Sequence, residues 1–294
     1  MAGAGLIAIK RRIKSINNTK KITKAIGLVA TSKLRKARQK LELNNNYYSS
    51  ISDIMNEILS DSNLEKGVYF KSNGNNKKLY IVITSDSGLC GGFNGNVISK
   101  TLQEISDHRE NSVLITVGKK GRTYLKKYKI ESIAEYVDVP EIPTLKEVKA
   151  ILDKAITLYL NGEIGEINVV YTHFISSVKQ ECKVKKLLPI TSESNEKDIN
   201  TFMEFEPDKS EVLEGISELY LKQTLLNLLL NSKTCEESSR MAAMDGATQN
   251  ANDLLDKLNL KYNRIRQSSI TQEISEIVGG AQAQNKGGIS CQIT

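Results

Sequence analysis

The chain has 294 residues, enough for one or two domains, and a formal net charge of +7. Hydrophobic residues make up 39% and aromatic residues 5%, with no tryptophan, which fits a thin, elongated core better than a large globular one. The four cysteines lack CxxC spacing, which argues against a zinc site or a disulfide framework. No stretch reaches the roughly 18 apolar residues of a membrane span, so we expect a soluble protein of a reducing, cytosolic compartment.

Positive charge is concentrated at the start of the chain. Residues 1–40 hold twelve Lys and Arg and no acid, whereas the remainder carries a net charge of −5. A solvated helix face is the plainest interpretation of such a run, but it usually mixes signs to gain i,i+4 ion pairs. The absence of acids therefore favours a localised acidic partner.

Residues 6–59 are predicted to form one long helix, because apolar residues recur along it at spacings of 3 and 4. Asn44, Asn45 and Asn46 lower the local helix propensity, yet the periodicity resumes in phase, so we expect a weak point and not a break. The predicted stripe consists of Ile9, Ile13, Ile16, Ile22, Ile26, Ala30, Leu34, Ala37, Leu41, Tyr47, Ile51, Ile54 and Ile58.

The middle of the chain alternates between strands and helices, after a polar linker at residues 64–76. Such alternation predicts a Rossmann-like, open and largely parallel sheet with helices on its faces, in an α/β protein. All four prolines fall between residues 140 and 207, which also places loops and strands here. The expected strands are 78–84, 112–117, 133–139, 167–174 and an antiparallel 181–188, with helices at 95–109, 119–128 and 145–160.

A second long helix is predicted from Pro207 to Ala283, with Asp208 and Glu211 forming a capping box at its start. At about 1.5 Å per residue it would be roughly 100 Å long, which calls for a partner helix of comparable length. The first helix supplies one. The predicted contact seam consists of Ala247, Ala251, Leu254, Leu258, Tyr262 and Ile265.

Motifs for catalysis or nucleotide binding are weak. The glycine-rich loop from Ser85 to Asn94 follows the first strand, but its spacing matches neither GxGxxG nor a P-loop, and 118–121 fails the same tests. A tight turn or a docking surface explains the loop better. We expect His108 to be solvated and His173 to be a half-buried packing residue. These observations favour a structural or mechanical protein with no catalytic, cofactor-binding or metal-binding residues.

Four motifs occur in order along the chain. They are residues 17–26 with 29–37, residues 85–94, residues 240–245, and residues 262–263 with 266–273 and 277–281. Together they resemble the gamma subunit of F-type ATP synthases, from the first helix to about Ala283, and residues 284–294 extend beyond the usual end. The chain departs from the family at Leu28, where methionine is usual, at Ser87, where arginine is usual, and at Gly246.

The resemblance implies a long antiparallel, left-handed coiled coil that turns as the rotor shaft inside a ring of three alpha and three beta subunits. It implies no active site in this chain: the shaft transmits torque and makes the three beta-subunit catalytic sites unequal. The implied domains are the N-terminal coiled-coil helix 1–62, a central α/β domain 63–206, the C-terminal coiled-coil helix 207–283 and an extension 284–294.

The resemblance also implies contact residues. Ile270, Ile274, Ile277 and Val278 would form an apolar bearing tip, and Glu218 and Tyr220 would lie in a foot near the c-subunit ring and the epsilon subunit. The implied beta-subunit contacts are Lys21, Lys24, Lys33, Arg35, Lys36, Cys90, Arg266, Gln267, Thr271 and Gln272.

Two alternatives remain open beside the rotor. A nucleic-acid-binding coiled coil would use residues 1–40 on phosphates but leaves the acidic remainder unexplained. A dinucleotide enzyme would use the middle domain. Under the rotor interpretation we expect no nucleic-acid binding, no direct membrane insertion, and a peripheral location at the cytoplasmic face of a bacterial cell membrane.

Overall fold

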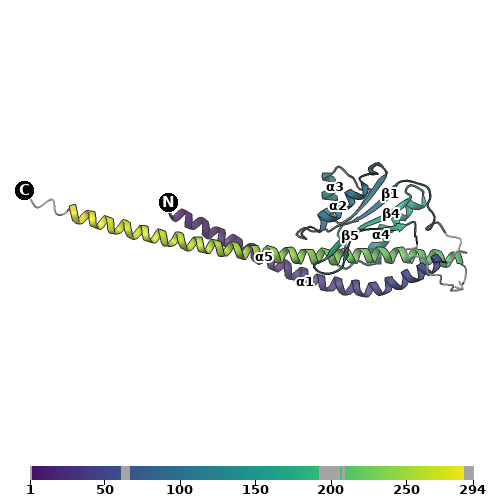
Figure 1. The fold of residues 1–294 in the computed structure, drawn as a ribbon, viewed down its shortest axis with the longest axis horizontal. Coiled ribbons are helices and arrows are strands. Elements are labelled where there is room, and N and C mark those ends of the chain that lie inside the picture. The colour runs from purple at the N-terminus through teal and green to yellow at the C-terminus, as the bar shows by residue number, and fades with distance from the viewer. Residues whose placement is uncertain (1, 61–66, 192–205, 207–208, 288–294) are drawn as a thin grey trace, which may run out of the picture. The chain divides into compact units, whose positions relative to one another are not determined.

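The computed structural model describes residues 2–60, 67–191, 206 and 209–287. The chain forms two compact units. Unit 1 comprises residues 1–27 and 244–294, and unit 2 comprises residues 28–243. Two long helices, α1 (Ala2–Ser60) and α5 (Lys209–Gly287), contribute segments to both units (Figure 1).

In each unit, a segment of α1 pairs with a segment of α5 in antiparallel fashion. In unit 1, the Thr23 and Thr248 hydroxyls lie 2.8 Å apart. In unit 2, the Gln223 side-chain amide donates to Asn44 Oδ1 at 2.9 Å, and Ile58 packs with Leu213. Residue numbers therefore rise along α1 while they fall along the paired segment of α5. The predicted antiparallel pairing of the terminal helices is confirmed within each unit.

The positions of α1 that face α5 follow a heptad pattern, and this pattern is more regular than the spacing of the apolar residues alone. A row of buried or half-buried positions can be followed along α1 in steps of 3 and 4, and it includes polar residues such as Lys20 and Thr23; other half-buried residues, such as Ile26 and Lys33, lie beside it. A 3.5-residue period is typical of left-handed coiled coils. The α1 seam consists of Leu6, Ile9, Ile13, Ile16, Lys20, Thr23, Gly27, Ala30, Leu34, Ala37, Leu41, Asn44, Tyr48, Ile51, Met55 and Ile58.

Four predicted seam positions are wrong by one residue. Ile22, Tyr47, Ile54 and Leu254 are 59%, 50%, 45% and 46% exposed. Their neighbours Thr23, Tyr48, Met55 and Leu255 occupy the seam instead. At Thr23 the seam residue is polar, and a prediction that follows apolar residues passes over it. At the other three positions two adjacent residues are both apolar or aromatic, so hydrophobicity alone does not distinguish them and the 3.5-residue register decides. The exposed apolar residues next to the seam are then left available to other surfaces.

The central sheet lies in unit 2 and has the strand order β3-β2-β1-β4-β5. The first four strands are parallel, whereas β5 is antiparallel to β4. This confirms the Rossmann-like, largely parallel sheet. The elements are β1 (Lys78–Ile83), α2 (Phe93–Ile105), a 3₁₀ turn (Arg109–Asn111), β2 (Ser112–Val117), α3 (Lys119–Lys127), β3 (Ala134–Tyr136), α4 (Leu145–Leu160), β4 (Glu166–Phe174) and β5 (Gln180–Leu188).

Both faces of the sheet are covered, and β1 shows how the sequence achieves this. Leu79, Ile81 and Ile83 point to one face, where they pack with α4 and α5, while Tyr80 and Val82 point to the other. Successive side chains on a strand alternate between faces, so a continuous apolar run requires cover on both. Figure 1 shows α2 and α3 on the face opposite α5.

Helix boundaries in the middle of the chain follow local chemistry. The Thr144 side chain accepts from the Lys146 backbone, and Glu147 accepts from the Thr144 backbone at 2.8 Å, so a full capping box starts α4 where the sequence predicts the helix. The helix predicted at 95–109 instead begins at Phe93 and ends at Ile105. The extended segment predicted at 133–139 forms a strand over 134–136 only. Asp208, the predicted cap of α5, lies outside the described residues.

Gly118 illustrates a position that only glycine can hold. Its φ is +94°, and a Cβ there would lie 2.3 Å from the carbonyl oxygen of Thr84. The residue therefore allows the end of β2 to approach the end of β1 closely. This gives a structural reason for the glycine in the 118–121 segment.

Candidate functional site

The glycine-rich loop between β1 and α2 is held by a buried polar network. The Asn94 side chain accepts from the Ser85 backbone at 3.0 Å and donates to the Ser85 hydroxyl at 2.7 Å. Asn94 also donates to Cys90 Sγ at 3.1 Å, and the Cys90 thiol is 2% exposed. The network fixes the loop as a tight turn, with the Cys90 side chain pointing into the chain. Leu89, which is 61% exposed, presents the outer surface of the loop.

Asp86 joins the loop to the carboxyl ends of three strands. Its carboxylate accepts from the backbone N–H of Lys119, at the start of α3, at 3.1 Å, and from those of Asp138 and Val139 at 3.1 and 3.2 Å. A doubly wound sheet usually binds phosphate with helix N-termini at this edge. Here a carboxylate already occupies that position and would repel a phosphate group. The arrangement favours the structural interpretation of the loop.

A buried charge cluster on α5 anchors the same loop. Arg240 is 7% exposed and contacts Glu236 at 2.8 Å and Glu237 at 2.6 Å. Its guanidinium also donates to the Ser87 hydroxyl at 2.8 Å and to the Gly88 carbonyl at 3.3 Å. The charged guanidinium thus makes four hydrogen bonds, of which two hold it to the acids of α5 and two tie it to the loop.

The cluster shifts the ionisation of its members. Burial raises the pKa of Glu237, and the neighbouring Arg240 opposes this only in part. One Glu237 carboxylate oxygen is buried without a hydrogen-bond partner, which agrees with the raised pKa. For Arg240, burial lowers the pKa but the hydrogen bonds and charges of Glu236 and Glu237 outweigh it, so the pKa is raised. The guanidinium therefore remains charged.

The predicted basic contact residues lie mostly on an open face of α1. Lys21 and Lys24 are exposed in unit 1, and Arg35 and Lys36 are exposed in unit 2. Lys33 differs, because its ammonium lies 2.5 Å from a carboxylate oxygen of Glu141 in the loop before α4, and its side chain is 35% exposed. Part of the positive charge is therefore already paired inside the chain.

The end of α5 in unit 1 has an exposed apolar surface, as the sequence suggests. Ile270, Ile274, Ile277 and Val278 are 48%, 57%, 72% and 50% exposed. Every residue from 271 to 282 is exposed. Solvent-exposed apolar clusters of this kind commonly mark contact surfaces.

The polar contact residues predicted near this end are also exposed. Arg266 and Gln267 lie on the solvent side of α5. The Thr271 hydroxyl donates to the Gln267 carbonyl at 3.0 Å, and the Gln272 amide donates to Glu276 at 2.9 Å. These local hydrogen bonds keep both side chains on the helix surface, where a partner could exchange them for its own groups.

At the start of α5, the two predicted foot residues have different environments. Glu218 is exposed and forms an i,i+4 ion pair with Lys222. Tyr220 is half-buried and packs against the core between the sheet, α4 and α5. Of the two residues, only Glu218 is therefore exposed.

The histidine predictions hold. His108 is exposed, and His173 is half-buried in edge-on contact with Tyr171, with 6.3 Å between ring centroids. Burial and the nearby Lys183 lower the pKa of His173, so the ring is neutral at pH 7. Among the described residues, no group of three or more His, Cys, Asp or Glu side chains is placed to hold a metal ion. In the same part of the chain, no helix has the length and hydropathy needed to span a membrane.

Sequence reasoning missed the role of two residues. The sequence marks Arg240 only as part of a motif and Asp86 only as a loop residue. A basic residue at i+3 and i+4 from two acids is an ordinary surface pattern, so its burial becomes apparent only when the loop closes over it. The acid after a buried strand is likewise a weak signal until its three backbone donors are in place.

Comparison with known proteins gives consistent results. A family model described as ATP synthase matches residues 5–284. The ATP synthase gamma chain of Clostridium novyi is 84% identical over 284 residues, which cover 97% of this chain and all of the relative. The ATP synthase gamma chain of Clostridium acetobutylicum is 58% identical, covering 96% of this chain and 99% of the relative.

Solved structures show the same fold at low identity. A chain of the Euglena gracilis mitochondrial ATP synthase, in a structure of its OSCP/F1/c-ring, matches with a TM-score of 0.71 and 17% identity, over 99% of this chain and 97% of that one. A chain of the Tetrahymena thermophila mitochondrial ATP synthase, from its central stalk and c-ring, gives 0.61 and 24%, over 77% and 99%.

Proposed function

The chain belongs to the ATP synthase gamma-chain family, and from this membership we infer that it is the central rotor shaft of an F-type ATP synthase. The shaft carries torque between a membrane ring and the catalytic ring, and its asymmetry makes the catalytic sites unequal. The observation that carries this inference is the heptad pairing of α1 with α5 in both units, beside an exposed basic face and an exposed apolar helix end. Within each unit, paired helices resist bending better than a single helix does, as a shaft requires.

We propose partner subunits from the exposed surfaces of the chain. The basic face of α1, with Lys21, Lys24, Arg35 and Lys36 exposed, would meet acidic loops of the beta subunits in turn. Screened attraction between solvated charges is weak and long in range, so it biases rotational position without locking it. Because Lys33 is paired with Glu141, we assign it a smaller share of this attraction.

The loop from Ser85 to Asn94 would contact one beta subunit through Leu89 and the surrounding backbone. The buried thiol of Cys90 would serve this contact indirectly, by holding the turn in shape. Arg240 would transmit force between the loop and α5 through its hydrogen bonds to Ser87 and Gly88, while Glu236 and Glu237 hold the guanidinium in place.

The apolar end of α5 would turn within the alpha–beta ring as a bearing, because nondirectional apolar contact can be exchanged as the helix rotates. Arg266, Gln267, Thr271 and Gln272 would add a few directed hydrogen bonds there. Glu218 and Tyr220 would lie at the foot, facing the c-subunit ring and the epsilon subunit.

We further propose a peripheral position at the cytoplasmic face of a bacterial cell membrane, with the chain divided into a first helix (1–62), a central domain (63–206), a second helix (207–283) and an extension (284–294). The c ring, and not this chain, would supply the membrane-embedded part of the assembly.

Replacing Lys33, Arg35 and Lys36 with Ala tests the rotor assignment of the basic face. We expect ATP hydrolysis by the reconstituted complex to persist while ion pumping per ATP falls, because the charges guide coupling and are not needed for assembly. The measurement compares both rates in proteoliposomes.

A matched control replaces three exposed lysines of α3 and α4, Lys126, Lys149 and Lys154, with Ala and so removes the same charge. This variant should keep normal coupling. Equal losses of hydrolysis and pumping in the α1 variant, or equal effects of both variants, would contradict the assignment.

A further inference from the structure

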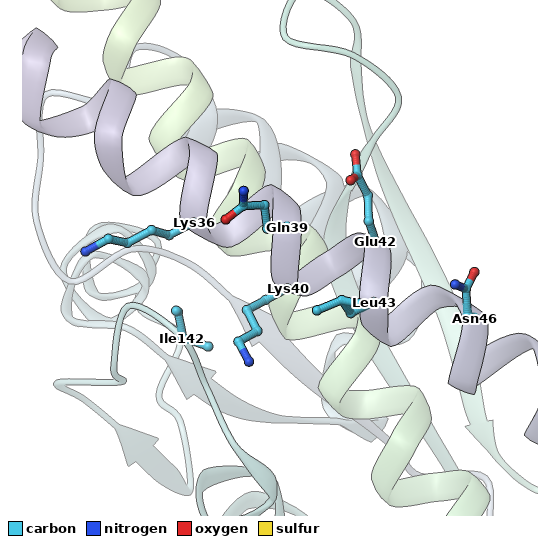
Figure 2. Close-up of a pocket in the computed structure, with 7 residues that line it drawn as sticks. All are labelled: Lys36, Gln39, Lys40, Glu42, Leu43, Asn46 and Ile142. Carbon is cyan, nitrogen blue, oxygen red and sulfur yellow. The ribbon is translucent and has the colours of Figure 1, made fainter.

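A groove in unit 2 runs between α1 and the loop that precedes α4. Two adjoining cavities of about 490 and 580 Å³ make it up, and they share Lys40, Leu43 and Ile142. Pro143 and Leu145 extend the loop side, and Leu226 and Leu230 of α5 contribute to the apolar lining. Figure 2 shows the side chains of Lys40 and Leu43 beside Ile142, on one side of α1.

The α1 wall of the groove is a second stripe in heptad register. Lys36, Lys40, Leu43 and Tyr47 are spaced by 4, 3 and 4 residues, each one residue before a seam position. Leu43 and Tyr47 are 66% and 50% exposed, although both have large hydrophobic side chains. The stripe repeats the spacing that already receives α5 on the neighbouring face. A further helix lying along α1 can follow the same repeat.

The charge at the groove is positive. Lys36 and Lys40 on α1 and Lys146 on α4 line it, and within the described part of the chain none of the three forms an ion pair. Glu42 also lines the groove, but its carboxylate pairs with Arg38 at 2.8 Å.

The two acids on the loop side are already engaged. Glu141 pairs with Lys33 at 2.5 Å, and Glu147 accepts hydrogen bonds from Thr144 at 2.7 and 2.8 Å. Those bonds to Thr144 lower the pKa of Glu147, so its charge is committed to the start of α4. The free charge facing an occupant is therefore that of the three lysines.

We propose that this groove docks an amphipathic α-helix of another protein, with Leu-like side chains on one face and acidic residues flanking them. From Lys36 to Tyr47 the stripe covers about 17 Å, which matches about three turns of a partner helix. The apolar face would cover Leu43, Tyr47 and Ile142, and the acids would pair with Lys36, Lys40 and Lys146. A second copy of this chain fits poorly, because it would bring like charges together.

The inference goes beyond the rotor assignment and is tested on the full-length chain by itself. Lys36 is among the residues proposed to face the beta subunits, whereas Lys40, Leu43 and Ile142 are not. A negative result in the coupling experiment above would therefore not contradict the groove proposal. A negative result in the binding experiment below would not contradict the rotor assignment.

The probe is a synthetic helical peptide of about 14 residues with Leu at heptad spacing and flanking Glu. Its twin carries Lys in place of each Glu. We expect saturable binding of the acidic peptide by fluorescence anisotropy, and at least tenfold weaker binding of the basic twin. Binding of both peptides with equal affinity would overturn the proposal, as would stronger binding of a single-stranded oligonucleotide of the same charge.

Matched variants locate the site. The double variant Lys36→Glu, Lys40→Glu should weaken the acidic peptide about tenfold or more and improve binding of the basic twin, whereas Lys10→Glu, Lys14→Glu makes the same charge change outside the groove and should have a small effect. Leu43→Ser should weaken binding without unfolding the chain, since the side chain is exposed. Equal effects of the two charge variants, or an unchanged affinity in Leu43→Ser, would refute the groove as the site.

Discussion

Replacing Arg240 with Met should destabilise unit 2 by about 3–5 kcal/mol, the usual cost of breaking a buried ion pair by removing one partner. Methionine keeps most of the aliphatic volume, so the loss comes from polar contacts. Arg240 makes charge-assisted contacts to Glu236 and Glu237 at 2.8 and 2.6 Å, and two more hydrogen bonds to the loop at Ser87 and Gly88. Without it, two carboxylates remain buried next to each other.

The measurement is urea unfolding followed by far-UV circular dichroism, with hydrogen exchange at residues 85–94 to detect release of the loop. Arg38→Met is the matched control, because Arg38 forms an i,i+4 pair with Glu42 at 2.8 Å on the surface, with both side chains about 60% exposed. That pair is worth only about 0.3–0.5 kcal/mol. The double variant Arg240→Met, Glu237→Gln should recover much of the loss, because Glu236 keeps its ion pair with Lys233 at 3.2 Å and no buried carboxylate is left unpaired.

The pH dependence of the Arg240→Met deficit has a defined sign. Burial raises the pKa of Glu237 above its ordinary value of 4.5, so the stability that its protonated form provides is lost as pH rises through the folded-state pKa. Removing Arg240 raises that pKa further. The deficit should therefore be largest at neutral pH and smaller near pH 4–5. A deficit below about 1 kcal/mol at pH 7, or one that grows on acidification, would refute this account of the cluster.

Other predictions concern single features of the fold. In thermal unfolding, Gly118→Ala should be much more destabilising than Gly162→Ala. Both glycines have a positive φ, which costs an alanine about 1–2 kcal/mol, but only at Gly118 would the added Cβ lie 2.3 Å from a backbone carbonyl oxygen. Equal costs would contradict the steric argument. Thr23→Val should cost about 1 kcal/mol because it removes the contact with the Thr248 hydroxyl. The double variant with Thr248→Val should cost less than the sum of the two single variants, because the shared contact is lost only once; additive costs would count against the pair. Deletion of residues 284–294 should leave torque unchanged in a single-molecule rotation assay, and a loss of torque would assign the extension a mechanical role.

Much of the fold can be predicted from the sequence, because it depends on local periodicity. The run from Leu79 to Ile83 is apolar throughout, and a strand of that kind must be covered on both faces. Thr144 followed by Glu147 marks the start of α4 through hydrogen bonds within four residues. Such signals lie within one element, so they can be recognised without knowing what packs against it.

The seam residues and the charge cluster could not be predicted in this way. Whether Ile22 or Thr23 faces α5 depends on which residue continues the register set by the partner helix, and hydrophobicity alone points to the wrong one. The burial of Arg240 likewise depends on a loop more than 150 residues away in sequence. Both outcomes are decided by contacts between segments that are distant along the chain.

The sequence by itself determined the element types, the basic start, the apolar end and the family, since each depends on residue order and spacing. Only the tertiary structure decided which charges are available. It paired Lys33 with Glu141, enclosed Arg240 between two acids, and left Lys36 and Lys40 beside an apolar groove. The physical reason is that the free energy of a charge depends on its solvent exposure and its neighbours, and both are set when distant segments meet.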